Sequence, residues 1–538
     1  MYDKIKLYIL AVMAAVVPLV IRVKVVPFVG LAKEQTNISQ LVSGQKLNYF
    51  HYYKAVYLWV IAGALLFILL GQLIDRKSRI KKDNKIFIAI GIFALFTILS
   101  SFMSDFRYIS IWGFYDRTEG LITYMAYMAV FLAAYSIDFS RIDLRPFKWG
   151  LVVSTVILSL IGIGQFYGHN FLETNLAYKL SIPAEMQAQM PTLTFRFKDI
   201  AYATLFNPNY VGSFTSISTP FFLGLFLFES EKKKKIIYFS LSALSFAFMI
   251  ASGSRAGLVG VMAAAALLVG MNLKNFKRDW KRYASMIAVF FAIAFVFNFQ
   301  NPDRVFGKIN SLFSEAGKVV EREAEVITGG ADNQEQTATP EKAENKSPDG
   351  KDASGKQEET ATPEKEEIKP SDVKDASEEK SIMYGEGLTT LGSGRGYLWY
   401  KTLGMMKSTL VIGNGPDTYV MKFPHADAFK ENFNKITDKP HNLYLQIGVN
   451  QGLIALLAFL FLNTYAFWKF WKQIDFKFSS RLDQILLMLD ASIFGYLMTS
   501  IFNDSVVSVA PIYWAMLGIF LSIMVSRKDM DKSKLFEM

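Results

Sequence analysis

The chain has 538 residues, of which 52% are hydrophobic and 15% aromatic, and its formal charge is +11. Apolar runs long enough to cross a bilayer recur along it, and most lysines and arginines stand between them, so the charge is typical of a rim facing anionic lipid and not of a nucleic-acid-binding surface. Cysteine is absent, which excludes disulfides, thiolate metal sites and a cysteine nucleophile.

About twelve apolar runs are predicted as membrane spans. Their ranges are 5–27, 54–74, 86–103, 120–137, 148–167, 210–228, 236–252, 256–272, 284–300, 442–467, 483–503 and 505–525. The first run follows Lys4 and Lys6, but it is longer than the apolar core of a signal peptide and lacks a clean cleavage site, so we expect an uncleaved span. Basic residues alternate between the connections, which predicts both termini on the cytoplasmic side. We predict an all-α polytopic protein of the bacterial cytoplasmic membrane.

Three parts are expected along the chain: 1–300 with nine spans, an extracytoplasmic loop at 301–440, and 441–538 with three spans and a cytoplasmic tail. Within the loop, 329–380 is an insert of low complexity in which TATPEK and KDAS each occur twice. Such a composition cannot bury enough apolar surface to fold alone. After the insert, Tyr397 to Met406 is predicted to form a short amphipathic helix.

The usual catalytic and nucleotide-binding signatures do not occur in the sequence. His425 and His441 with Asp427 and Asp438 could be drawn as a metal site. Their spacing matches no helical ligand pair, and ordinary loop residues are the favoured interpretation. We therefore predict that the protein uses no metal and no cofactor.

Four arginines on the predicted outer side are candidate anion ligands. Arg255 lies in ASGSRAGLVG, where glycines and serines leave the backbone accessible at the start of a helix, and a helix N-terminus beside an arginine favours an anion. The alternative is an arginine that reaches to the interface. Arg395 has a similar glycine-rich surround in GSGRGYLW. Arg117 and Arg196 lie among aromatic residues, and an interfacial role fits them equally well.

The stretch DKPHNLYLQIGVNQGLIALLAFLFL, at 438–462, starts polar and becomes apolar. Asn442, Gln446 and Asn450 stand four residues apart, so they share one helix face, and we expect them to line the wet end of a cavity. His441 precedes this helix, whose N-terminus would keep the imidazole neutral and able to accept a proton. A histidine that only caps the helix is the alternative.

Together, SGSRAG, GRGYLWYKTL with IGNGPDTY, and HNLYLQIGVNQGLIALLAFL resemble the O-antigen ligase and O-antigen polymerase superfamily, which are polytopic GT-C-type glycosyltransferases of bacterial envelopes. The resemblance implies metal-independent, inverting transfer of a glycan from an undecaprenyl-diphosphate donor to an acceptor hydroxyl on a lipid, polysaccharide or protein. It makes His441 the catalytic base and Arg255 and Arg395 the diphosphate ligands, with Arg117 and Arg196 as further candidates. Ligase, polymerase and protein O-glycosyltransferase are not separated by these motifs.

Two other classes of protein fit part of the sequence. A secondary transporter or a lipid-linked glycan flippase would also have about twelve spans, but such proteins tend to show internal repeats, and no convincing similarity between two halves occurs here. A membrane scaffold for envelope polymers could use the insert for docking, and it would not need the histidine and the arginines.

Overall fold

The structure is a computed structural model that describes residues 1–33, 36, 38–75, 83–140, 142–188, 190, 193, 195, 197–300, 307, 386–430, 436–478 and 480–527. The chain divides into two compact units, one of Met1–Ser311 with Leu398–Met538 and one of Leu312–Tyr397. The expected insert at 329–380 and Arg196 lie outside the described residues.

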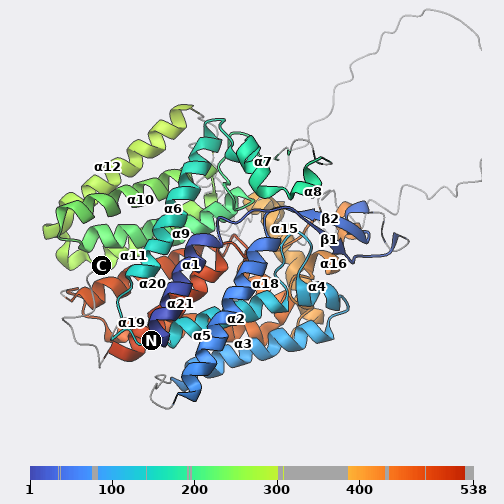
Figure 1. Cartoon of the computed structure of the whole chain (residues 1–538), viewed down its shortest axis with the longest axis horizontal. Coiled ribbons are helices and arrows are strands. Elements are labelled where there is room, and N and C mark those ends of the chain that lie inside the picture. The colour runs from blue at the N-terminus through green and yellow to red at the C-terminus, as the bar shows by residue number, and fades with distance from the viewer. Residues whose placement is uncertain are drawn as a thin grey trace, which may run out of the picture. The chain divides into compact units, whose positions relative to one another are not determined.

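Long apolar helices dominate the first unit (Figure 1). Eight helices are long and apolar enough to cross a membrane in the part of the chain that the structure describes. They are α2 (Tyr52–Ile74), α3 (Asn84–Met103), α6 (Arg145–Phe166), α9 (Pro208–Phe228), α10 (Lys232–Ser252), α12 (Phe276–Gln300), α19 (Leu453–Gln473) and α20 (Arg481–Thr499). Three shorter apolar helices are α5 (Leu121–Tyr135), α11 (Arg255–Met271) and α21 (Ala510–Ser526). A multi-pass membrane protein is therefore confirmed, whereas the count of about twelve spans is not.

The remaining helices are short or lie outside the apolar set. They are α1 (Tyr2–Val16), α4 (Arg107–Trp112), α7 (Asn175–Ser181), α8 (Ala184–Gln187), α15 (Glu386–Ser408), α16 (Tyr419–Lys422), α17 (His425–Lys430) and α18 (Leu443–Gln451). The helix expected at 397–406 is confirmed as part of the longer α15.

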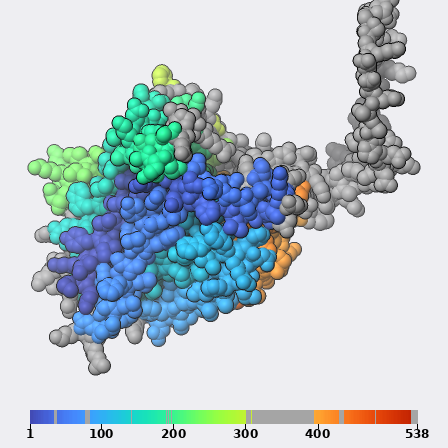
Figure 2. All heavy atoms as spheres, turned by 45° about the vertical axis from the view of Figure 1, so that its right-hand side comes forward, coloured from blue at the N-terminus to red at the C-terminus, as the bar shows by residue number. Residues whose placement is uncertain are grey.

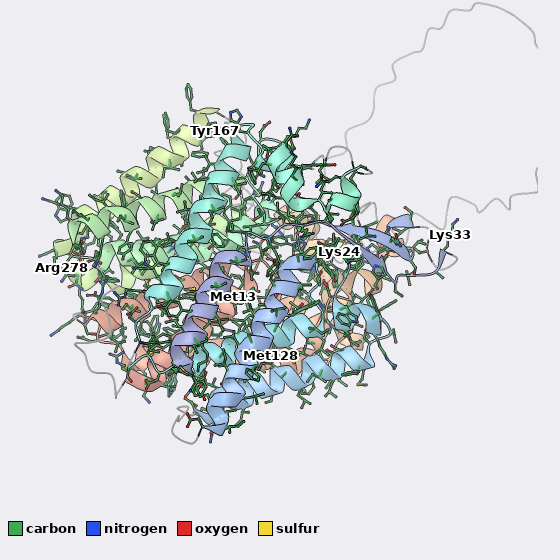
Figure 3. All side chains as sticks on the ribbon, viewed as in Figure 1. Met13, Lys24, Lys33, Met128, Tyr167 and Arg278 are labelled. Carbon is green, nitrogen blue, oxygen red and sulfur yellow. The ribbon has the colours of Figure 1, made fainter. Side chains whose placement is uncertain are left out.

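The first expected span, 5–27, ends early and gives way to a β-hairpin. After α1, the strand β1 (Lys24–Phe28) pairs antiparallel with β2 (Gly44–Asn48), with Lys24 opposite Asn48. Val25 and Val26 are β-branched and favour an extended backbone, while Pro27 lacks an N–H group and is tolerated because a two-stranded sheet consists of edge strands. Figure 3 labels Lys24 at the start of β1 and Lys33 in the loop beyond it, and Figure 2 shows the hairpin among the N-terminal residues at the surface.

The tenth expected span, 442–467, consists of two helices because the chain turns at Gly452. Its φ of 92° is in the left-handed region that glycine tolerates, and an added Cβ would lie 2.1 Å from the carbonyl oxygen of Val411. Beside the break, the Gly415 N–H donates to the carbonyl of Asn450 at 2.7 Å, and the Leu453 N–H donates to that of Leu410 at 2.8 Å. The break thus separates the polar α18 from the apolar α19.

Glycines bring α9, α11 and α20 into close contact (Figure 1). A Cβ on Gly257 of α11 would lie 2.4 Å from the Cα of Gly212 on α9, and one on Gly260 would lie 1.9 Å from Oγ1 of Thr499 on α20. The start of α11 therefore lies against the start of α9 and the end of α20. This common end of the three helices carries part of the candidate site.

Candidate functional site

His441 and Asp504 form a hydrogen-bonded pair in the first unit. Nδ1 of His441 lies 2.8 Å from Oδ2 of Asp504, and the Asp504 side chain is 2% exposed whereas that of His441 is 38% exposed. The backbone of His441 has a φ of 51°, which is uncommon for a residue other than glycine. Asn442 caps α18 by accepting a hydrogen bond from the Leu445 N–H at 2.9 Å, so His441 is not the cap. A carboxylate on Nδ1 favours the tautomer whose Nε2 accepts a proton.

The segment ahead of His441 is held by a buried arginine. Nε of Arg117 lies 2.8 Å from Oδ1 of Asp417, and its Nη1 lies 2.8 Å from Oδ2 of Asp438 and 3.5 Å from Oδ1 of Asp116. Burial disfavours the guanidinium charge, but these carboxylates outweigh it and raise the pKa of Arg117. Arg117 thereby fixes Asp438, three residues before His441. Its diphosphate-binding role stays a prediction, and two of its nitrogens already bond to protein carboxylates.

The β-hairpin supports the segment that carries Arg117. The Phe28 ring packs edge-on against the Phe114 ring at a centroid distance of 5.2 Å, and the Arg117 guanidinium lies over the same Phe114 ring at 4.4 Å. Oδ2 of Asp417 accepts hydrogen bonds from the N–H groups of Phe114 at 2.6 Å and of Glu119 at 3.2 Å. The hairpin and Asp417 therefore hold the turn around Arg117 from two sides.

A second buried ion pair holds the loop of Asp504. Nζ of Lys439 lies 2.9 Å from Oε2 of Glu119 and donates to the carbonyl of Ser505 at 2.6 Å. The Ser505 hydroxyl donates to Oε1 of Glu119 at 2.6 Å, and the Ser505 N–H donates to Oε1 of Gln446 at 2.9 Å. Burial lowers the pKa of Lys439, but Glu119, Tyr210 and Asp504 together more than offset this effect, so the pKa is raised. This network holds Lys439 and Gln446, on the two sides of His441, and Ser505, which follows Asp504.

The predicted polar stripe of α18 is buried among protein groups. Asn442, Gln446 and Asn450 are each less than a tenth exposed. Asn442 caps the helix, Gln446 bonds the loop after Asp504, and the carbonyl of Asn450 accepts the Gly415 N–H. Their role as cavity-lining residues stays a prediction.

Trp399 on α15 lies beside the same segment. Its indole Nε1 donates to the carbonyl of Pro440 at 3.1 Å, and its ring lies 5.9 Å from that of Phe502. Residues on both sides of the His441–Asp504 pair therefore contact one aromatic side chain. Arg395 lies on the part of α15 that belongs to the second unit, and its role stays a prediction.

Arg255 is the first residue of α11, in agreement with the helix start that the glycines and serines around it predict. Ser254 caps this helix by accepting the Gly257 N–H at 3.1 Å, and Gly253 has a φ of 60°, in the left-handed region. The arginine is partly buried. A helix start with a capping serine and an arginine suits an anion, but a role in ligand binding stays a prediction.

The first turns of α9 connect the start of α11 with the loop of Asp504. Nδ2 of Asn503 donates to the carbonyl of Asn209 at 2.8 Å and to Oγ of Ser213 at 3.0 Å. Gly212, between these two residues, contacts Gly257 of α11. Arg255 and the histidine–aspartate pair therefore lie at the same end of the helices.

Asp504, Glu119 and Lys439 were not singled out from the sequence. Asp504 stands in the polar connection NDS between two apolar runs, and a carboxylate at the edge of a span is a recognisable signal of function. Its partner His441 is 63 residues away. No local pattern indicates which groups bond over that separation.

Three of the four residues of the possible metal site make other contacts in the structure. Nε2 of His425 accepts the Thr437 N–H at 3.1 Å, while Asp438 bonds Arg117 and His441 bonds Asp504. Among the described residues, no group of three or more histidines and carboxylates could hold a metal ion. The expectation that no metal or cofactor takes part stays a prediction.

Residues 240–460 match the family model described as O-antigen ligase. Comparison with curated proteins found no match. The matched segment begins in α10 and ends in α19, and it includes Arg255, Arg395 and His441 but neither Arg117 nor Asp504. The match confirms the resemblance indicated by the motifs. Together with the long apolar helices, the match supports, at a coarse level, a membrane enzyme that transfers glycans.

Proposed function

We propose that this protein of the O-antigen ligase superfamily transfers a glycan from an undecaprenyl-diphosphate-linked donor to an acceptor hydroxyl at the outer face of the cytoplasmic membrane. The acceptor is a lipid, a polysaccharide or a protein. The reaction inverts the anomeric centre and needs no metal. The observation that carries the proposal is the His441–Asp504 pair, in which a buried carboxylate holds a partly exposed imidazole.

The pair supports a general-base step on the acceptor. With Nδ1 hydrogen-bonded to Asp504, Nε2 of His441 takes the proton from the acceptor hydroxyl as that oxygen attacks the anomeric carbon. The bond between this carbon and the donor phosphate oxygen breaks, and the electron pair leaves with undecaprenyl diphosphate. Asp504 stabilises the imidazolium that forms. His441 has a left-handed backbone, its ring bonds Asp504, and the three residues before it are each held by another segment of the chain. These contacts keep the ring in one position, which lowers the entropic cost of reaching the transition state.

The start of α11 supports the donor side of the reaction. A leaving diphosphate gains negative charge, and preorganised cations stabilise it best when they need not move. Arg255 supplies a permanently charged planar fork next to a helix N-terminus. Arg395 is a second proposed ligand of the diphosphate. Because Arg117 bonds Asp417 and Asp438, we assign it first to positioning the His441 segment.

The test separates donor binding from turnover in purified protein reconstituted into vesicles with a lipid-linked glycan donor. His441→Ala should bind donor as the wild type does and lose about 10²–10⁴-fold in turnover, the usual contribution of a general base. His169→Ala is the matched control, because His169 is an exposed histidine outside the site, and it should turn over normally. A chelator should leave both rates unchanged.

Two outcomes would contradict the proposal. Loss of donor binding in His441→Ala, as severe as in Arg255→Ala, would move the histidine to the diphosphate site. Movement of the donor glycan across the vesicle membrane without any transfer to an acceptor would favour the flippase instead.

A further inference from the structure

A groove of about 680 Å³ lies between α1 and α6, and no residue of the candidate site lines it. The two helices lie side by side and run in the same direction (Figure 1). They touch where Gly150 of α6 meets Ala11 of α1, because a Cβ on Gly150 would lie 2.2 Å from the Ala11 carbonyl oxygen. Lys4 and Arg145, near the two helix starts, both line the groove.

The two walls of the groove repeat one order of side chains. From the helix start inward, each wall has a cation, then an aromatic residue, then a valine, all exposed and spaced by four: Lys4, Tyr8 and Val12 on α1, and Arg145, Trp149 and Val153 on α6. Residues four apart lie on one helix face. Each wall therefore changes from charged to interfacial to aliphatic along its length.

We propose that this groove binds one anionic diacyl phospholipid from the leaflet in which α1 and α6 begin. A phospholipid has the same order of groups, with a charged phosphate, polar ester linkages and acyl chains. Aromatic side chains prefer the ester level of a bilayer, and basic pockets between membrane helices bind anionic headgroups. The phosphate lies between Lys4 and Arg145, the esters lie between Tyr8 and Trp149, and one acyl chain follows the valines.

The charges at the groove mouth favour an anionic over a zwitterionic headgroup. Asp143 also lines the groove, and its Oδ2 accepts from Nη2 of Arg145 at 2.7 Å, which holds the guanidinium at the mouth. Lys4 and Arg145 against Asp143 leave one net positive charge. The nearby Asp3 is paired with the buried Lys6 at 2.9 Å. A free phosphate would meet the same cations but would leave the apolar walls uncovered, so the combination fits a lipid. The inference rests on the groove between α1 and the long apolar helix α6 and not on the proposed glycan transfer.

The experiment measures lipid retention by native mass spectrometry of the full-length protein. The protein is incubated with equal amounts of phosphatidylglycerol and phosphatidylcholine that have identical acyl chains. Each basic residue near a membrane surface contributes about a fivefold preference for anionic lipid, so the wild type should retain phosphatidylglycerol preferentially. The double variant Lys4→Gln, Arg145→Gln should reduce this preference by about 25-fold.

A matched variant removes the same charge elsewhere. Lys232 and Lys233 are exposed at the start of α10 and do not line the groove, so Lys232→Gln, Lys233→Gln should keep the wild-type preference. Val12→Trp fills the apolar part and should reduce retention of both lipids. If a double variant does not fold, the single exchanges Lys4→Gln and Arg145→Gln replace it. Equal retention of the two lipids by the wild type, equal losses in the two double variants, or unchanged retention in Val12→Trp would each overturn the proposal.

Discussion

The exchange Asp504→Asn tests the pair on which the proposed reaction depends. It preserves the size of the side chain and removes the charge that lies 2.8 Å from Nδ1 of His441. Two unit charges about 4 Å apart interact by about 4 kcal/mol at an effective dielectric constant of about 20. Because the His441 side chain is 38% exposed, water screens part of this interaction, and we take about 2–3 kcal/mol as the lost stabilisation of the imidazolium. That free energy corresponds to a fall in kcat on the order of 10²-fold.

The new amide adds a second effect in the same direction. If the NH2 group of the new amide faces Nδ1, that nitrogen must accept its hydrogen bond, and the imidazole proton moves to Nε2. Nε2 can then no longer take the proton from the hydroxyl that receives the glycan. The expected fall in kcat is therefore a lower bound, while binding of the lipid-linked donor should change by less than about threefold, because the pair acts only as charge develops on the imidazole.

The assay compares kcat and donor affinity in vesicles for Asp504→Asn, His441→Ala and the double variant. Residues that act as a unit are not additive, so the double variant should turn over no more slowly than His441→Ala. Asp105→Asn is the matched control, since Asp105 is 72% exposed and pairs with Lys422. The reasoning would be refuted if Asp504→Asn kept more than about half of the wild-type kcat, or if the two losses multiplied in the double variant.

Three further predictions follow from the same region. Arg255→Lys keeps the charge but loses the planar fork, so turnover and donor affinity should fall strongly, and further in Arg255→Ala. Burial raises the pKa of Asp116 from 3.8 to about 6, so the carboxyl stabilises the fold only while it is protonated, and this contribution is lost as the pH rises through about 6. At pH 7.5 in detergent, Asp116→Asn should therefore have a higher melting temperature than the wild type. Lys439→Ala leaves Glu119 buried without its cation and should lower the free energy of unfolding by about 3–5 kcal/mol, whereas the double exchange Lys439→Met, Glu119→Gln should recover much of the loss.

The membrane helices were predictable because the bilayer requires long apolar runs. The ranges predicted for α2, α3, α9 and α10 agree with the structure to within a few residues. The errors occur where hydropathy is uninformative. At 24–28 it does not detect that strand pairing with 44–48 replaces a helix, and at Gly452 it does not detect a φ that only glycine tolerates easily.

The local part of the candidate site was also predictable. The glycines and serines around Arg255 indicated a helix start, and the structure places the arginine at the first position of α11. Gln446 and Asn450 lie one turn apart within α18, as their spacing predicts, whereas Asn442 is the N-cap and has an extended backbone. The environment of these polar side chains depends on other segments of the chain. In the structure they are buried and lie next to the loop after Asp504 and to Gly415.

The environment of His441 is entirely a product of tertiary structure. Asp438, Lys439, Pro440 and His441 are consecutive, yet each is held by a different segment of the chain: the first two by Arg117 and Glu119, more than 300 residues away, and the others by Trp399 and Asp504. The sequence shows the histidine and the arginines but not these pairings, so it predicts Arg117 as a diphosphate ligand, whereas the structure pairs this arginine with Asp417 and Asp438. A buried charge is stable only with its partner. The positions that hold the proposed base are therefore expected to be as sensitive to substitution as the base itself, although most of them contact neither donor nor acceptor in the proposed reaction.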